Sequence, residues 1–139
     1  AVAFLGPPFA RPDEAVLKAA AKAQAVLRVE NGGLLPGDAW TGSLDEAWTA
    51  ETAFFALFDA GTGQPAGTAY WLGWLAAHRT GAGELAEQVN IEGRPVSVAP
   101  LAWTDALVVL ATLAEGGDLP TIPVPTVTAP AVAPAPPAR

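Results

Sequence analysis

The sequence predicts an all-α domain with about four helices. Apolar residues recur at the spacing of one helix face in four separate segments, which are divided by loops rich in glycine and proline. Alternating apolar residues, which would indicate strands, are confined to a short stretch near residues 89–98. The chain has 139 residues, of which 51% are hydrophobic and 15% are charged. This composition allows a buried core and excludes a wholly disordered chain.

The first predicted helix covers residues 14–27. Its apolar stripe consists of Val16, Ala20, Ala23 and Leu27. Asp13 is placed to start the helix, and the acidic Glu14 suits the positive end of the helix dipole. Glu14 and Lys18 stand four residues apart and are expected to pair on the solvent side. Residues 1–12 contain three prolines and are predicted to be an extended lead-in.

Two more helices are expected after a long loop over residues 30–47. Thr49 is predicted to cap a helix that runs to about Ala60. The next helix runs from about Pro65 to His78, with a wide aromatic stripe. His78 is predicted to be the C-terminal residue of that helix, where its charge would favour the dipole, and not a catalytic base.

A second long loop, over residues 79–100, contains a predicted short hairpin around residues 92–95. Two long loops that join helices indicate one working face. The fourth helix is expected from about Pro100 to Ala114. Its apolar residues cover nearly the whole circumference, which predicts burial on all sides. Residues 117–139 are rich in proline and alanine and are predicted to form an extended tail or linker.

Composition excludes several classes of function. The net charge of −7 argues against nucleic acids and anionic membrane surfaces as partners, and no apolar run is long enough to span a membrane. There is no cysteine and only one histidine, so a thiolate or histidine-rich metal site is not expected. The glycines match neither a dinucleotide fingerprint nor a phosphate-binding loop, so no cofactor is predicted. The absence of cysteine is compatible with both a cytoplasmic and a secreted protein.

The chain also contains no methionine, which indicates a processed chain or a piece of a longer one. With only four helices in the chain, few neighbouring helices are available to cover the apolar surface of the fourth. Both observations favour further helices upstream. A self-contained four-helix bundle is the alternative.

Carboxylates and aromatic rings in loops are the residues left for chemistry. Glu84 and Glu87 lie in the second long loop. In and just after the first loop, Trp40 and Trp48 are surrounded by four acids: Asp38, Asp45, Glu46 and Glu51. Carbohydrate sites use acids for proton transfer and flat rings to stack on sugars. Simple solvation, capping and turn formation are the alternative roles of these acids.

Two stretches resemble the C-terminal part of the bacterial glucoamylase-like glycoside hydrolases. These are inverting exo-acting α-glucosidases that include glucoamylase, glucodextranase and a branch of trehalases. In the family, a loop with Pro-Glu-Gln or a similar triplet precedes Pro-Leu-Ala/Thr-Trp at the start of a helix. The counterparts here are residues 86–88 (AEQ) and residues 100–103 (PLAW). Upstream, GDAWTG and AWTAETA are similar to the family segment Asp-x-Tyr-x-Gly-Gly-x-Pro-Trp, which lines the sugar pocket. The similarity covers most of residues 4–115.

The resemblance implies an (α/α)6 toroid, with residues 1–116 as the C-terminal part of that catalytic domain. The active site would lie where two long loops meet on one face. The family's general base falls on Glu87, and its general acid lies in an upstream part with no counterpart in this chain. The implied substrate-binding residues are Asp38, Trp40, Trp48, Gln88 and Trp103. The implied partners are an α-glucoside or α-glucan substrate and the missing upstream part of the domain.

This sequence also departs from the family pattern. Leu34, Leu35 and Pro36 stand where the family often has an arginine shortly before the position of Asp38. Trp40 replaces a tyrosine, and residues 46–48 read EAW instead of Asn-Pro-Trp. These changes leave the linkage open among α-1,4, α-1,6 and the α,α-1,1 bond of trehalose. The alternative function is a non-catalytic helical module that binds a sugar or a protein partner.

Overall fold

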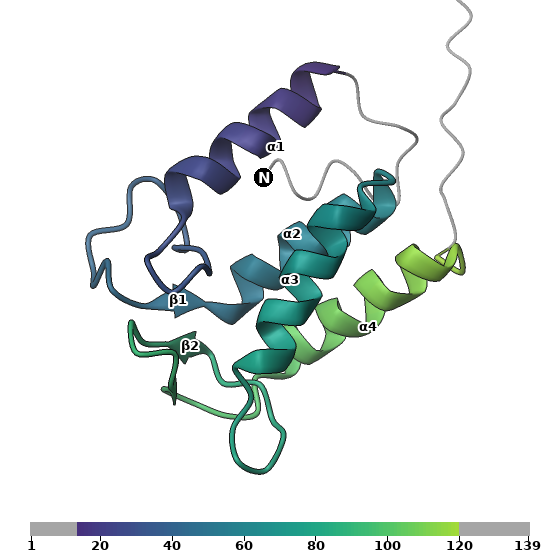
Figure 1. Cartoon of the computed structure of the whole chain (residues 1–139). Coiled ribbons are helices and arrows are strands. Elements are labelled where there is room, and N and C mark those ends of the chain that lie inside the picture. Colours follow the sequence, from purple (N-terminus) through teal and green to yellow (C-terminus); the bar gives the residue numbers. More distant parts are fainter. Residues whose placement is uncertain (1–13, 120–139) are drawn as a thin grey trace, which may run out of the picture.

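The computed structural model of the protein describes residues 14–119, which form a small, mostly helical domain (Figure 1). Its elements are α1 (Glu14–Leu27), β1 (Ala47–Trp48), α2 (Thr49–Gly61), α3 (Pro65–Ala77), β2 (Gln88–Val89), β3 (Pro95–Val96) and α4 (Ala102–Gly116). Four predicted helices are thereby confirmed. The expected lead-in over residues 1–12, the helix start at Asp13 and nearly all of the expected tail lie outside the described residues.

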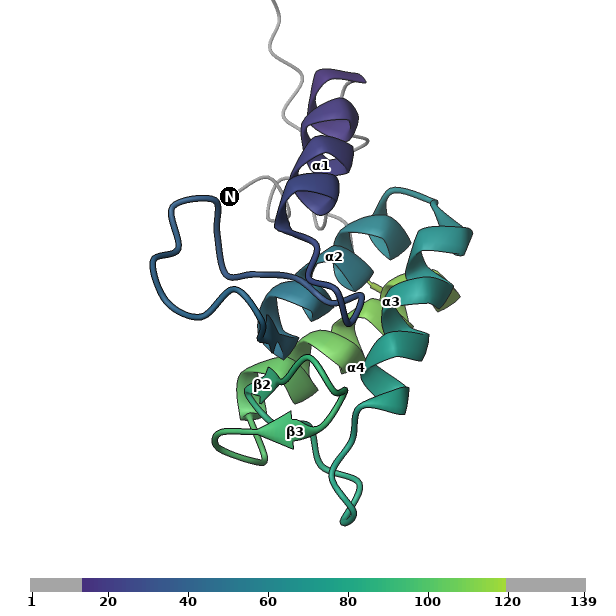
Figure 2. The same cartoon turned by 60° about the vertical axis from the view of Figure 1, so that its left-hand side comes forward.

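The helix α2 lies at the centre and packs against both α3 and α4. Figures 1 and 2 show α2 and α4 running in the same direction, with α3 antiparallel to both. The two long loops, from α1 to β1 and from α3 to α4, meet at the end where α2 and α4 begin. The short α2–α3 link lies at the opposite end. The expected placement of two long loops on one face is confirmed.

A three-stranded antiparallel sheet, in the order β1-β2-β3, joins the two loops. Ala47 pairs with Val89 and Trp48 with Gln88, and the predicted hairpin between β2 and β3 is confirmed. The Asn31 side chain adds a further link, since its amide donates to the Asn90 carbonyl at 2.9 Å. Pairing of β1 with β2 is the feature that places the start of α2 beside the second loop.

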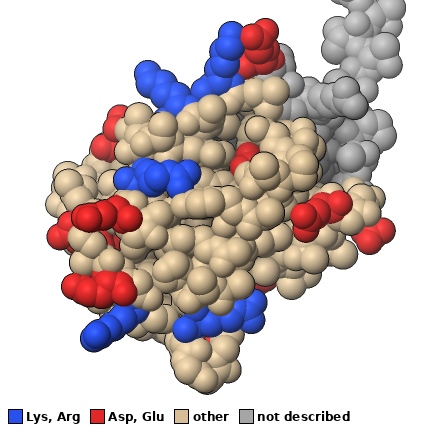
Figure 3. Space-filling view, in the orientation of Figure 1, with Lys and Arg blue, Asp and Glu red and all other residues tan. Residues whose placement is uncertain are grey.

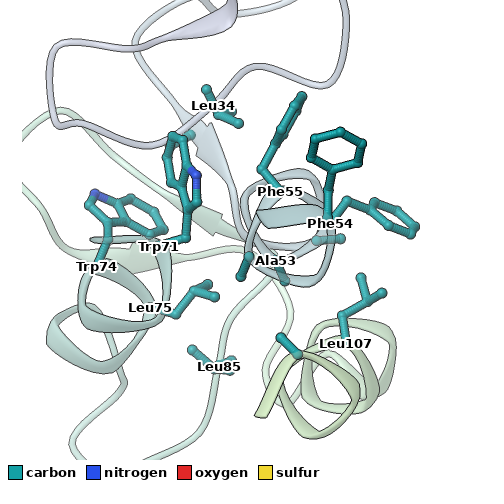
Figure 4. Close-up of a cluster of buried hydrophobic side chains, with 14 of the residues drawn as sticks. Leu34, Ala53, Phe54, Phe55, Trp71, Trp74, Leu75, Leu85 and Leu107 are labelled. Atoms are coloured by element: carbon teal, nitrogen blue, oxygen red, sulfur yellow. The ribbon is translucent and has the colours of Figure 1, made fainter. Parts of the chain in front are cut away.

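The core is centred on α2, which is packed between α3 and α4. Phe58, Trp71 and Leu75 are almost fully buried, and Leu34 of the first loop closes one side of the cluster. Figure 4 shows Trp71, Trp74 and Leu75 of α3 facing α2, while Leu107 of α4 approaches α2 from the other side.

Within residues 14–119, no helix combines the length and apolarity needed to cross a membrane.

Asp59 is a buried carboxylate that ties three helices together. It is 2% exposed and accepts hydrogen bonds from Trp71 Nε1 at 3.1 Å and from the side-chain amides of Gln24 and Gln64 at 3.3 Å each. Burial raises the pKa of Asp59, and the donors from Trp71 and Gln24 oppose that rise. Its site is also tight, because a Cβ at Gly67 would collide with the carboxylate.

Replacing Asp59 with Ala is expected to lower the free energy of unfolding by about 1–3 kcal/mol, because the buried Trp71 Nε1–H loses its acceptor. Asp59→Asn keeps an acceptor and tests the charge. The pKa of Asp59 is higher in the folded state than in the unfolded state. The free energy of unfolding of the wild type should therefore fall as the pH rises from the pKa of Asp59 in the unfolded chain through its pKa in the folded chain. Urea unfolding at several pH values should show this slope in the wild type and a weaker slope in Asp59→Asn. An equal slope in both would contradict the assignment.

The helix α4 corrects the expectation of burial on all sides. One face, with Thr104, Leu107 and Ala111, is buried, whereas the opposite face is exposed. The exposed large side chains are Trp103, Val109, Leu110 and Leu113. Within residues 14–119, the main neighbour of α4 is α2. The helix α4 therefore has more apolar surface than its neighbours cover.

Two predicted helix starts are also corrected. Trp48 occupies the N-cap position of α2, and Thr49 is the first helical residue. The Thr49 hydroxyl donates to the Ala86 carbonyl at 2.6 Å and lies 2.8 Å from the Thr104 hydroxyl, so it joins α2, α4 and the second loop. The helix α4 begins at Ala102 instead of Pro100, because the Leu101 N–H donates to the Leu85 carbonyl in that loop.

Candidate active site

Glu87 lies where the second long loop enters β2. Its N–H donates to the Val98 carbonyl at 2.8 Å, and its carbonyl accepts the Thr49 N–H at 3.0 Å. The preceding residue, Ala86, is buried. The Glu87 backbone is therefore held between the segment that follows β3 and the first residue of α2.

The Glu87 side chain is oriented by Ser97. The Ser97 hydroxyl donates to Glu87 Oε2 at 2.6 Å, a short distance that is typical of a charge-assisted bond to a carboxylate. Ser97 has a φ of 67°, in the left-handed region that non-glycine residues seldom adopt and that is enriched at functional sites. Ser97 could not be predicted from the sequence, because it lies between two valines in a segment that suggests only a strand.

Another acid, Glu51, belongs to the helix turn whose first residue, Thr49, donates its N–H to the Glu87 carbonyl. Glu51 is in the first turn of α2, and its Oε2 is buried with no hydrogen-bond partner within residues 14–119. Burial raises the pKa of Glu51, a bond to its own backbone N–H opposes this, and the negative charge of Glu87 raises it further. The sequence placed Glu51 among the acids near Trp40 and Trp48 but did not indicate that its carboxyl is partly buried.

Trp48 and Trp40 form an aromatic pair at the same small sheet. Trp48 faces Gln88 across the β1–β2 pair. Its ring meets the Trp40 ring edge-on, with centroids 5.3 Å apart, and its Nε1 is buried without a hydrogen-bond partner in the described part of the chain. Trp40 is 37% exposed. Trp40, Trp48 and Gln88 are thus gathered around the β1–β2 junction next to Glu87.

Asp38 and Trp103 are placed elsewhere. Asp38 lines an open groove of about 260 Å³ between α1 and the first loop, together with Lys22 and apolar residues of α1. Trp103, 54% exposed, packs edge-on against Phe54 with ring centroids 5.4 Å apart. Within residues 14–119, no hydrogen bond, ion pair or ring contact joins either residue to Glu87.

His78 has the structural position predicted for it. It is the C-cap residue of α3, and its Nδ1 lies 2.7 Å from the Trp74 carbonyl oxygen. Among residues 14–119, no group of three or more histidine, aspartate or glutamate side chains could hold a metal ion.

Most of the surface visible in Figure 3 is uncharged. Figure 3 shows several acidic side chains on the left, over the loop-bearing end, interspersed with basic ones, and a broad area without charge between them.

Comparison of the chain with protein-family models, with curated proteins and with solved structures finds no match.

Proposed function

We propose that this chain is the C-terminal part of the catalytic domain of an inverting α-glucoside hydrolase. The enzyme would release glucose from α-glucans or small α-glucosides, with Glu87 as the general base. One observation carries the proposal: Glu87 lies at the loop-bearing end, held by Ser97 and followed by Gln88, which pairs with Trp48. The resemblance of residues 86–88 and 100–103 to the glucoamylase-like family supports the same role.

In this proposal, Glu87 works as an ionised base. A general acid from the upstream part protonates the oxygen of the leaving group. Glu87 takes a proton from a water molecule on the opposite face of the sugar, and the oxygen of that water bonds to the anomeric carbon as the glycosidic bond breaks. Inverting enzymes hold the two carboxyls about 6.5–9.5 Å apart to admit this water. Ser97 would fix the direction in which the Glu87 carboxylate meets the water.

The arrangement of helices supports a place in an (α/α)6 toroid. The parallel pair α2 and α4, with the antiparallel α3 between them in sequence, matches two inner helices joined through an outer one. In such a toroid the upstream helices would cover the exposed face of α4. The parent polypeptide would therefore extend upstream of residue 1.

The exposed face of α4 gives a test of this placement. Leu110 is 38% exposed, so Leu110→Ala should change the free energy of unfolding of the 139-residue chain by less than about 1 kcal/mol. In the parent polypeptide the same change should cost about 2–5 kcal/mol, because Leu110 would be buried there. Leu107→Ala, at a site that is 5% exposed, is the control and should destabilise both forms. A small effect of Leu110→Ala in both forms would contradict the toroid.

The activity itself is tested by glucose release from maltose, isomaltose and trehalose. The parent polypeptide should hydrolyse at least one of them, and the preferred one identifies the linkage. If the well-folded parent releases no glucose from any of the three, the hydrolase proposal fails. Sugar binding without turnover would then favour the binding-module alternative.

A further inference from the structure

The tip of the first long loop holds the Trp40 indole in one orientation. Residues 38–45 are exposed, yet Trp40 Nε1 donates to the Ser43 carbonyl at 3.0 Å, and the Trp40 N–H donates to the Gly37 carbonyl at 3.1 Å. The ring also meets the Trp48 ring edge-on, with centroids 5.3 Å apart. A surface tryptophan is thereby held both by its own loop and by a residue of β1.

Gly42 lies directly against the Trp40 indole. A Cβ atom added at Gly42 would come closer than 3.0 Å to three atoms of the ring, Cζ2, Cε2 and Nε1. Cβ atoms in proteins essentially never make such contacts, so any other residue at position 42 would displace the ring or the loop. The collision includes Nε1, the atom that ties the ring to the Ser43 carbonyl.

Other reasons for a glycine do not apply at position 42. The φ of Gly42 lies outside the left-handed region that favours glycine, and the residue is exposed rather than packed in the core. By contrast, a Cβ at Gly37, in the same loop, would have no atom of residues 14–119 within 4 Å. The requirement for glycine at position 42 therefore comes from the position of the Trp40 ring.

We propose that Gly42 is a positioning residue that acts through Trp40, because the absence of a side chain there lets the indole lie on the loop and keep its contact with Trp48. Trp48 in turn pairs with Gln88, the residue after Glu87. A ring that is already fixed loses little conformational freedom when a ligand packs against it, so this geometry favours binding. The role in substrate binding rests on the proposed function, in which Trp40 contacts the sugar. The position of the ring itself can be measured without any reaction.

The first test is NMR of the indole N–H signals of the 139-residue chain, with Trp40→Phe and Trp48→Phe to assign two of them. Gly42→Ala is expected to shift the signals of Trp40 and Trp48, because the added methyl group displaces the Trp40 ring. The signal of Trp71, whose ring is buried in the core, should stay in place. Gly37→Ala is the matched control and should leave all three signals unchanged. Unmoved signals of Trp40 and Trp48 in a folded Gly42→Ala chain would overturn the proposal.

The second test is a double-mutant cycle in the parent polypeptide. Gly42→Ala alone is expected to raise KM for the preferred disaccharide by about 2–10-fold, the size of one ring contact, with little change in kcat. In a Trp40→Ala background the same change should have no further effect on KM or on the temperature of unfolding, because the ring that it would displace is absent. An undiminished effect in that background would overturn the proposal.

Failure of the proposed function would look different. The parent polypeptide would then release no glucose, while the NMR signals of Gly42→Ala would still show whether the glycine holds the Trp40 ring in place.

Discussion

Replacing Glu87 with Gln is expected to lower glucose release by the parent polypeptide by about 10²–10⁴-fold. Gln has nearly the same shape, and its side-chain oxygen can still accept the Ser97 hydroxyl, but it cannot take a proton from the attacking water. The loss should therefore fall mainly on kcat, with little change in KM. Steady-state kinetics on the preferred disaccharide would measure both constants.

The control for this variant is Glu84→Gln, in the same long loop. Within residues 14–119 no hydrogen bond or ion pair joins the Glu84 side chain to Glu87, so its removal should leave kcat within a few fold. Thermal unfolding should show that both variants are folded. Near-normal kcat in Glu87→Gln would contradict the assignment of the base.

Replacing Trp71 with Ala is expected to lower the free energy of unfolding by about 3–5 kcal/mol. Trp71 is 1% exposed, and its indole lies against Phe55 of α2 and beneath the Arg28 guanidinium, which is 4.7 Å from its ring. Its Nε1–H also satisfies the buried Asp59. Small domains have about 5–15 kcal/mol in total, so this single change would remove a large part of the stability.

Urea unfolding followed by circular dichroism would measure the effect, with Trp103→Ala as the matched control. Trp103 is 54% exposed in the 139-residue chain, and its main ring contact is the edge of Phe54. Its loss should cost about 0.5–1.5 kcal/mol. Similar effects of the two substitutions would contradict the placement of Trp71 in the core and of Trp103 at the surface.

The helices could be predicted from the sequence because each is a long segment with one periodic pattern. The prediction for residues 14–27 agrees with α1, the second helix differs from α2 by one residue at each end, and the third differs from α3 by one residue at its C-terminal end. The pairing of β1 with β2 could not be predicted, since two residues, Ala47 and Trp48, are too few to show a period. The exposed face of α4 was missed because an apolar residue such as Leu110 indicates a need for burial but not whether a neighbour is present.

For the site, the sequence indicated Glu87 and Gln88 by local motif, and Trp40 and Trp48 by their place in an aromatic, acidic loop. In the structure, Trp48 pairs with Gln88, the residue after Glu87, and the Trp40 ring packs against the Trp48 ring. The placement of Ser97 beside Glu87 depends on an unusual backbone conformation at Ser97. The placement of Glu51 depends on the backbone bond between Thr49 and Glu87, which are far apart in the sequence, and neither feature leaves a local pattern. Asp38 was grouped with them by its place in the acidic, aromatic loop and by motif, but it lines a groove with residues of α1 instead.

The most direct test of the central claim is chemical rescue of Glu87→Ala in the parent polypeptide. The substrate is α-glucosyl fluoride, whose leaving group needs no strong acid, and azide is added as the nucleophile. If Glu87 is the base of an inverting hydrolase, azide should occupy the space of the activated water and bond to the anomeric carbon as fluoride leaves. We expect β-glucosyl azide as the product seen by NMR. An α-configured azide, or no azide-dependent product from a folded variant, would contradict it.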